Sequence, residues 1–154
     1  FPGYNFDVFT SADVQYQIDV TQPVGSRIVG LQYQGAAINP AQEFVIATNN
    51  YRATSGKSFL PELDGRATIY ASPDANRDVV IAYIKAHPNI SRANNGAAKS
   101  WRFAKTPTAG KVLFKSAANA LPVAQAAGLT NVSVEQADDG TGTQRGIYRI
   151  DLGQ

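Results

Sequence analysis

The sequence contains no cysteine and no methionine, and it has one histidine and one tryptophan. Without cysteine, disulfide bonds, thiolate catalysis and zinc sites with cysteine ligands are all excluded. Because the chain starts at Phe1 without an initiator methionine, we expect that a leader was removed or that the sequence is a piece of a longer protein.

Long apolar runs are absent as well. No segment reaches the length of about 18 apolar residues that spans a membrane, and none resembles the hydrophobic core of a signal peptide. We therefore expect no membrane partner for the chain.

Motifs for catalysis and metal binding are also missing. The only histidine, His87, precedes Pro88 at a predicted helix end, where it can interact with the helix dipole or simply be exposed. A lone histidine without a carboxylate cluster does not make a zinc or two-metal site, and there is no GxSxG, Walker A or GxGxxG motif. The Asp138-Asp139-Gly140 segment lacks calcium-loop spacing and indicates a turn. We predict no catalytic residue, no metal ligand and no cofactor in this chain.

Positive charge is concentrated in the middle of the sequence. Residues 51–115 carry eleven cations and four anions, whereas the whole chain has a net charge of only +2. Such a block can attract a phosphate-bearing ligand. It can equally be a solvated surface balanced by neighbours in space. We expect no nucleic-acid partner, because aromatic residues are not interleaved with the cations across this block.

The first third of the chain reads as three strands. Residues 14–21 alternate between apolar and polar and predict a half-buried strand, and residues 27–33 predict a second. The turn residues 22–26 between them favour a hairpin. Residues 43–48 form a continuous apolar run, which predicts a third strand buried on both faces.

The middle of the chain reads as loop and one helix. Residues 49–66 predict a loop, and short strands are expected at 67–70 and 101–103. Ser72 as N-cap and Pro73 as the first helical residue predict a helix that runs to about residue 86. Its apolar positions predict a buried stripe, made by Val79, Val80, Tyr83 and Ile84.

The tail restarts the pattern after a seam at residues 106–110. Its periodicity and turn residues predict a strand, a helix and two more strands, at 111–115, 117–127, 131–136 and 145–152. We predict an α+β fold with a mixed, largely antiparallel sheet and few helices, plus a small C-terminal β-α-β-β extension. The predicted division is residues 1–105 and 106–154.

A candidate ligand site follows the apolar run. The polar groups there are suited to a flat polar ring, because amides can hydrogen-bond it, cations can attract charge and Tyr51 can stack on it. Stacking a base on an aromatic ring contributes about 1–3 kcal/mol. The alternative for Tyr51 is core packing or a tyrosine corner. The candidate binding residues are Asn49, Asn50, Tyr51, Arg52, Ser55, Gly56 and Lys57.

Five segments of the sequence carry a resemblance to a known family: Tyr4-Asn5-Phe6-Asp7-Val8, residues 16–23, Ala47-Thr48-Asn49-Asn50-Tyr51-Arg52-Ala53, Ala71-Ser72-Pro73-Asp74 with Arg77, and Trp101-Arg102. Together they resemble the C-terminal domain of the 5′-nucleotidase family, in particular that of its periplasmic 2′,3′-cyclic-nucleotide phosphodiesterase and 3′-nucleotidase members. The resemblance runs in order from residue 1 to about 105, and the tail resembles an extension found in some members.

The resemblance implies a division of labour. In the family an N-terminal metallophosphoesterase domain holds two divalent metals and the catalytic residues, and the C-terminal domain clamps the base between two aromatic rings. Tyr51 falls on one of these ring positions. The sequence departs from the family pattern at Ser55, where many members have glycine, and at Lys57, where an aspartate near the ribose is common.

The resemblance therefore implies a fragment of a bacterial hydrolase. The second ring of the clamp and the metal domain would lie before Phe1. Its implied partners are a nucleotide or nucleoside and the N-terminal metallophosphoesterase domain, and its implied location is periplasmic or secreted. We expect the chain alone to be inactive. A stand-alone, non-catalytic binding or interaction module is the alternative.

Overall fold

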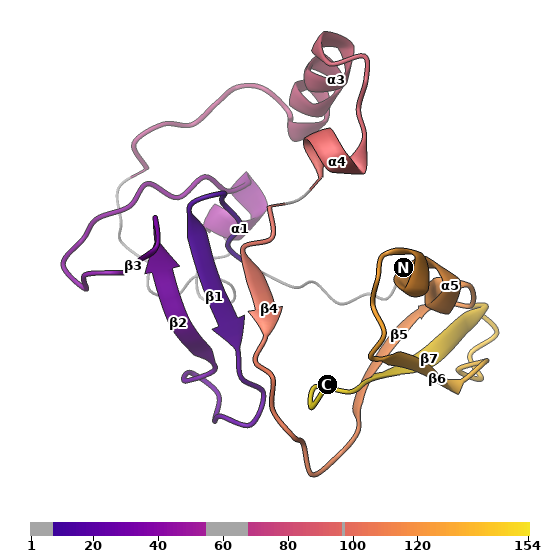
Figure 1. Ribbon diagram of the computed structural model, residues 1–154. Coiled ribbons are helices and arrows are strands. Elements are labelled where there is room, and N and C mark those ends of the chain that lie inside the picture. The colour runs from indigo at the N-terminus through magenta and orange to yellow at the C-terminus, as the bar shows by residue number, and fades with distance from the viewer. Residues whose placement is uncertain (1–7, 55–67, 97) are drawn as a thin grey trace. The chain divides into compact units, whose positions relative to one another are not determined.

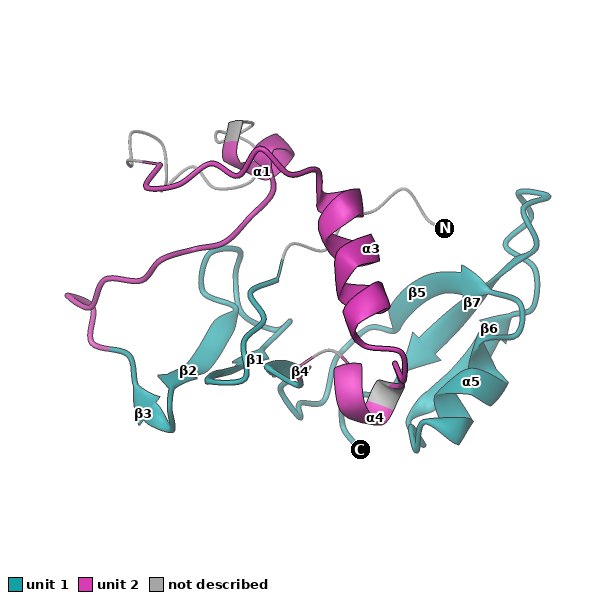
Figure 2. Ribbon diagram, turned by 90° about the horizontal axis from the view of Figure 1, so that it is seen from above, with its two compact units in different colours: residues 1–38, 99–154 teal, residues 39–98 magenta. Residues whose placement is uncertain are grey.

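The computed structural model describes residues 8–54, 68–96 and 98–154 (Figure 1). The chain divides into two compact units: unit 1 comprises residues 1–38 and 99–154, and unit 2 comprises residues 39–98 (Figure 2). The boundary predicted between residues 105 and 106 lies inside unit 1, between its two sheets, and stays a prediction.

The predicted hairpin is confirmed in unit 1. Strand β1 (Val14–Ile18) pairs antiparallel with β2 (Ile28–Tyr33). The alternation of apolar residues explains the buried face, on which Tyr16 is only 7% exposed. The turn between the strands contains Gly25 at a φ of 91°, a left-handed conformation that glycine adopts at little cost.

Two further strands complete this sheet. The two-residue strand β3 (Ala36–Ala37) pairs antiparallel with β2 and was not predicted from the sequence. Strand β4 (Trp101–Phe103) was predicted, and it pairs parallel with β1, which places Trp101 opposite Tyr16. The order is β3-β2-β1-β4, so β4 is an edge strand of the described sheet. A parallel pair needs a long crossover, which unit 2 supplies.

The C-terminal part of unit 1 confirms the predicted β-α-β-β extension. Its elements are β5 (Val112–Ala117), α5 (Ala120–Ala126), β6 (Val132–Gln136) and β7 (Arg145–Ile150). All pairings are antiparallel, and β7 lies between β5 and β6. Tyr148 on β7 is 1% exposed and stacks on Phe114 with ring centroids 5.4 Å apart. The α+β class with mixed, largely antiparallel sheets and few helices is confirmed.

Unit 2 contains the described helices α1 (Asn50–Thr54), α3 (Asn76–Ala86) and α4 (Arg92–Asn95). Helix α3 ends where predicted but begins later. The Ser72 hydroxyl accepts a hydrogen bond from the Asp74 amide at 3.2 Å and donates to its carboxylate, so these residues form a turn before the helix. The short helix α4 was not predicted from the sequence. No described helix is long and apolar enough to cross a membrane.

The stripe predicted to be buried on α3 is exposed. Its four side chains are between 46% and 56% exposed, and no described residue of the helix is buried. Helical periodicity identifies which face is apolar, but it carries no information about what covers that face.

The strand predicted at 43–48 is wrong. These residues have no regular structure, and Val45 is 78% exposed. An apolar run makes burial favourable, but a strand also needs a neighbouring strand for its backbone hydrogen bonds, and neither described sheet includes this segment. The strand expected at 67–70 is likewise absent from residues 68–70, and residue 67 lies outside the described residues.

Candidate functional site

The candidate site is built on helix α1, where the sequence analysis expected a loop. Asn49 caps this helix: its Oδ1 accepts a hydrogen bond from the Arg52 amide at 2.9 Å, and its carbonyl accepts one from the Ala53 amide at 3.0 Å. Asparagine is among the preferred N-cap residues, so the sequence did contain a signal for this helix. The Asn49 side-chain oxygen therefore caps the helix. The N–H groups of the same side-chain amide are the groups that can donate hydrogen bonds to a ligand.

Tyr51 occupies the first turn of α1, and its side chain is 59% exposed. Asn50 is also exposed, whereas Arg52 is half-buried. The alternative of core packing for Tyr51 is therefore wrong within the described structure. A ring exposed to this extent can stack on one face of a flat ligand.

The structure brings four predicted site residues onto one short element, from Asn49 to Arg52. The other three, Ser55, Gly56 and Lys57, lie outside the described residues. Successive residues of a helix leave its axis in different directions. Tyr51 and Arg52 therefore present a ring and a cation on different sides of the turn, and Arg52 can contact a ligand only from beside the ring.

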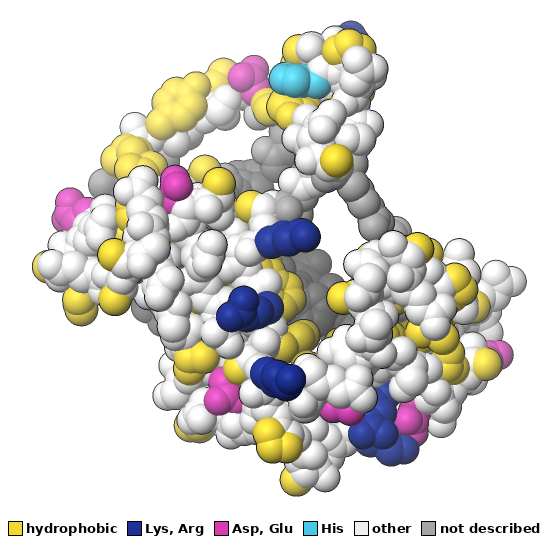
Figure 3. Space-filling view, viewed as in Figure 1, with side chains coloured by type: hydrophobic (Ala, Val, Ile, Leu, Met, Phe, Trp, Pro, Cys, Tyr) yellow, Lys and Arg dark blue, Asp and Glu magenta, His cyan; other side chains and the backbone are white. Residues whose placement is uncertain are grey.

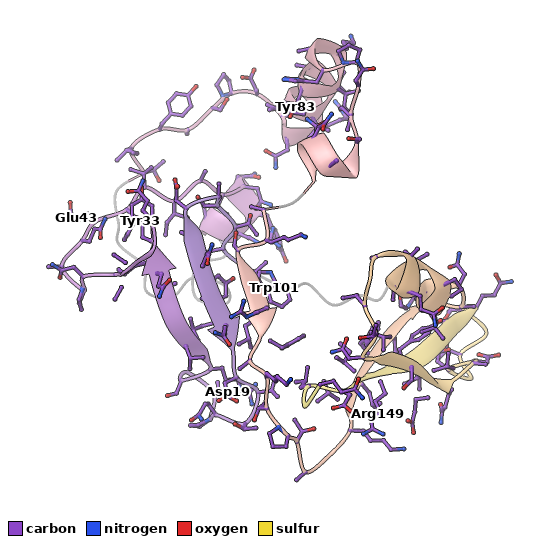
Figure 4. The ribbon with its side chains drawn as sticks, viewed as in Figure 1. Asp19, Tyr33, Glu43, Tyr83, Trp101 and Arg149 are labelled. Carbon is purple, nitrogen blue, oxygen red and sulfur yellow. The ribbon has the colours of Figure 1, made fainter. Side chains whose placement is uncertain are left out.

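His87 is confirmed at the end of helix α3. Its Nδ1 lies 2.9 Å from the Tyr83 carbonyl oxygen, and its ring stacks on Tyr83 with centroids 4.1 Å apart. The Asn95 side chain on α4 donates a hydrogen bond to the Tyr83 hydroxyl at 2.7 Å (Figure 4). These contacts connect the C-terminal end of α3 to α4, and they give His87 a structural role at the end of its helix.

The acidic pair in the C-terminal extension forms a turn, as predicted. Asp138 Oδ1 accepts a hydrogen bond from the Gly140 amide, and Asp139 Oδ1 accepts bonds from the Thr141 hydroxyl and amide. The Thr141 bonds, followed by the nearby Lys115, lower the pKa of the Asp139 carboxyl below its usual value. Asp139 thus stays ionised for a structural reason.

A metal centre does not fit the part of the chain that the structure describes. Among residues 8–54, 68–96 and 98–154, no group of three or more His, Cys, Asp or Glu side chains could hold a metal ion. We derive no catalytic step through a metal from this chain.

Comparison with known proteins finds bacterial relatives of this chain. The relative from Haemophilus influenzae, a 2′,3′-cyclic-nucleotide 2′-phosphodiesterase/3′-nucleotidase, is 34% identical over 99% of this chain and 25% of its own length. A trifunctional nucleotide phosphoesterase protein from Bacillus subtilis is 35% identical over 97% of this chain and 10% of its own length. The Yersinia enterocolitica protein with the same name as the first is 40% identical over 68% of the chain.

The chain spans about a quarter or less of the length of these curated relatives. No solved structure matches it. The family model of the 5′-nucleotidase C-terminal domain matches residues 2–63, a stretch that includes all seven candidate binding residues. Residues 2–63 are thus similar to the C-terminal domain of 5′-nucleotidases.

Proposed function

We propose that this chain is the nucleoside-binding part of a bacterial phosphoester hydrolase that acts on 2′,3′-cyclic nucleotides and 3′-nucleotides. The proposal rests on Tyr51, whose ring is 59% exposed on α1 within the stretch that matches the family model. The names of the relatives, which are bacterial phosphodiesterases and nucleotidases, supply the substrate class.

In the proposed complex, the base stacks on the Tyr51 ring. Such a contact is worth about 1–3 kcal/mol and depends little on the identity of the base. Asn50 and the amide N–H groups of Asn49 donate hydrogen bonds to the base or ribose, and Arg52 contributes positive charge from beside the ring. Ser55, Gly56 and Lys57 complete the proposed site on the basis of the sequence.

Hydrolysis itself is proposed to take place elsewhere in a longer parent chain. An N-terminal metallophosphoesterase domain would hold the two divalent metals and the catalytic residues, and it would be the partner of this domain. The parent protein would be periplasmic or secreted. We therefore expect this chain to bind substrate without cleaving it, so phosphatase activity of the purified chain that survives a chelator would contradict the proposal.

The test is calorimetric titration of the chain with adenosine and with 3′-AMP. We expect saturable binding that weakens about 5- to 150-fold in Tyr51→Ala, because the stacking energy is lost, and that changes little in Tyr51→Phe, which keeps the ring. Tyr70→Ala is the matched control, because Tyr70 is an exposed tyrosine of the same unit outside the proposed site. Equal affinities of wild type and Tyr51→Ala would refute the role of Tyr51.

A further inference from the structure

The edge strand β4 and its flanks carry a row of cations that has no role in the nucleoside site proposed at Tyr51. Lys99, Arg102 and Lys105 are all exposed, and Figure 3 shows basic side chains following one another over β4 and the adjoining segments. None of the three makes an ion pair with a described acidic side chain. We call these three residues the β4 row.

Other cations of unit 1 do form ion pairs with acids. In the same unit, Lys111 pairs with Glu135, and Lys115 pairs with Asp139 at 3.3 Å. The acid nearest in register to the row is Asp19, which follows β1, and its carboxylate instead accepts hydrogen bonds from the Thr21 amide at 2.9 Å and hydroxyl at 2.6 Å. The β4 row therefore remains a local concentration of positive charge.

Aromatic residues are interleaved with these cations. Trp101 and Phe103 lie between the basic residues in sequence, are half-buried, and form an edge-to-face pair with ring centroids 5.6 Å apart (Figure 4). Over residues 51–115 as a whole, cations and aromatics are not interleaved, and we therefore expected no nucleic-acid partner. Over residues 99–105 they are. Proteins that bind single-stranded nucleic acids combine cations, which contact the sugar-phosphate backbone, with aromatic rings, which contact the bases.

The spacing of the row indicates the size of the ligand. Residues three apart in an extended chain are separated by about 10 Å, so the outer cations are about 20 Å apart. A single phosphate group can be contacted by neighbouring cations but not by the whole row. An extended chain of phosphates can contact all three.

We propose that the β4 row binds the phosphates of a single-stranded oligonucleotide. Trp101 and Phe103, which are half-buried and leave the strand on the face opposite Arg102, contact its bases across the sheet edge. The site lies wholly within unit 1 and does not depend on the nucleoside site proposed at Tyr51. The competing explanation is that edge-strand cations only prevent strands of different molecules from pairing.

The protein contains an internal reporter for this site, because Trp101 is its only tryptophan. The experiment is a fluorescence titration of the chain with a ten-nucleotide oligothymidylate at several salt concentrations, with adenosine present to occupy the Tyr51 site. We expect saturable quenching. Three phosphate contacts predict a slope of about −2 in log K against log salt, since each contact on a single strand contributes about 0.7.

The variant that tests the row replaces Lys99, Arg102 and Lys105 with glutamine. The matched control replaces three basic residues elsewhere, Arg77, Lys85 and Arg149, with glutamine and so has the same net charge. We expect the first variant to lose binding at least tenfold with a slope near zero, and the control to keep the slope. All six side chains are exposed, so circular dichroism should show both variants folded.

Several outcomes would overturn the proposal. One is the absence of saturable quenching by the oligonucleotide. Another is an equal loss of affinity in both variants, which would mean that only net charge matters. Polyglutamate binding as tight as the oligonucleotide would assign the row to an acidic protein. Aggregation of the first variant without any change in oligonucleotide affinity would leave edge protection as its role. Adenosine binding should be unchanged in both variants, which separates this test from that of the Tyr51 site.

Discussion

The hydroxyl of Ser100 bridges the backbone of Ser11, a residue 89 positions away in sequence. Its Oγ accepts a hydrogen bond from the Ser11 amide at 2.9 Å and donates one to the Ser11 carbonyl at 2.8 Å. The Ser100 carbonyl also accepts a bond from the Tyr16 amide at 2.9 Å. These bonds fix the start of β4 against the segment before β1, at the point where the chain returns from unit 2.

The Ser100 bridge predicts a clear cost for Ser100→Ala. Ser100 is 2% exposed, and removal of its hydroxyl leaves a backbone donor and a backbone acceptor of Ser11 without their partner. We expect unfolding to become easier by about 1–3 kcal/mol. Urea denaturation followed by Trp101 fluorescence measures this change. Ser133→Ala, at an exposed serine of β6, should unfold at the wild-type urea concentration; equal midpoints for both variants would refute the bridge.

Gly146 has no room for a side chain. A Cβ atom at this position would lie 3.1 Å from the Tyr148 ring and hydroxyl and 3.2 Å from the Gln136 carbonyl oxygen. The Tyr148 hydroxyl donates a hydrogen bond of 2.7 Å to the Ala117 carbonyl, so the ring cannot move aside without losing it. We expect Gly146→Ala to destabilise the chain by about 1–3 kcal/mol in denaturation followed by circular dichroism. Gly110→Ala, where a Cβ meets open space, is the control.

The Asp139 carboxylate makes stability depend on pH. Its hydrogen bonds from Thr141 lower its pKa below the usual 3.8, and its side chain is 2% exposed. A carboxyl with a lowered pKa in the folded state adds stability above its unfolded pKa, and this is lost as the pH falls through the folded pKa. Wild type should therefore be more stable than Asp139→Asn at pH 6, and the difference should shrink below pH 3.8. A difference that does not change with pH would contradict this assignment.

Helix α3 lacks a side-chain cap, which offers a way to stabilise it. Ala75 is the N-cap residue, with the extended dihedrals that a capping residue needs but no hydrogen-bonding side chain. Ala75→Asp should add about 1 kcal/mol, and it should slow hydrogen exchange of the α3 amides about fivefold. Ala82→Asp, in the exposed middle of the same helix, should accelerate exchange instead. Equal exchange in the two variants would show that capping has no effect here.

Local patterns in the sequence were sufficient for much of the fold. The β1–β2 hairpin and the β-α-β-β extension follow from alternation and turn residues, which act between neighbours in sequence. The parallel pairing of Trp101 with Tyr16 was not predictable, because it joins segments 85 positions apart through contacts that no local pattern records. The strand expected at 43–48 failed for a related reason, since an apolar run does not specify its partner.

The residues of the candidate site have a different local structure from the one that the sequence led us to expect. Asn49 and Asn50 were interpreted as ligand groups at a strand end, whereas Asn49 caps a helix. The same chemical property, an amide that bonds backbone or ligand equally well, underlies both interpretations. The sequence left core packing open for Tyr51, and its 59% exposure in the structure argues against that alternative.

The most direct measurement for the central claim is an NMR spectrum of the chain with adenosine. Stacking on Tyr51 should shift the adenine ring protons upfield, and intermolecular nuclear Overhauser effects should connect them to the Tyr51 ring. Both signals should disappear in Tyr51→Ala and persist in Tyr51→Phe. Shifts and contacts that persist in Tyr51→Ala, or no change at millimolar adenosine, would contradict the claim that this chain binds nucleosides through Tyr51.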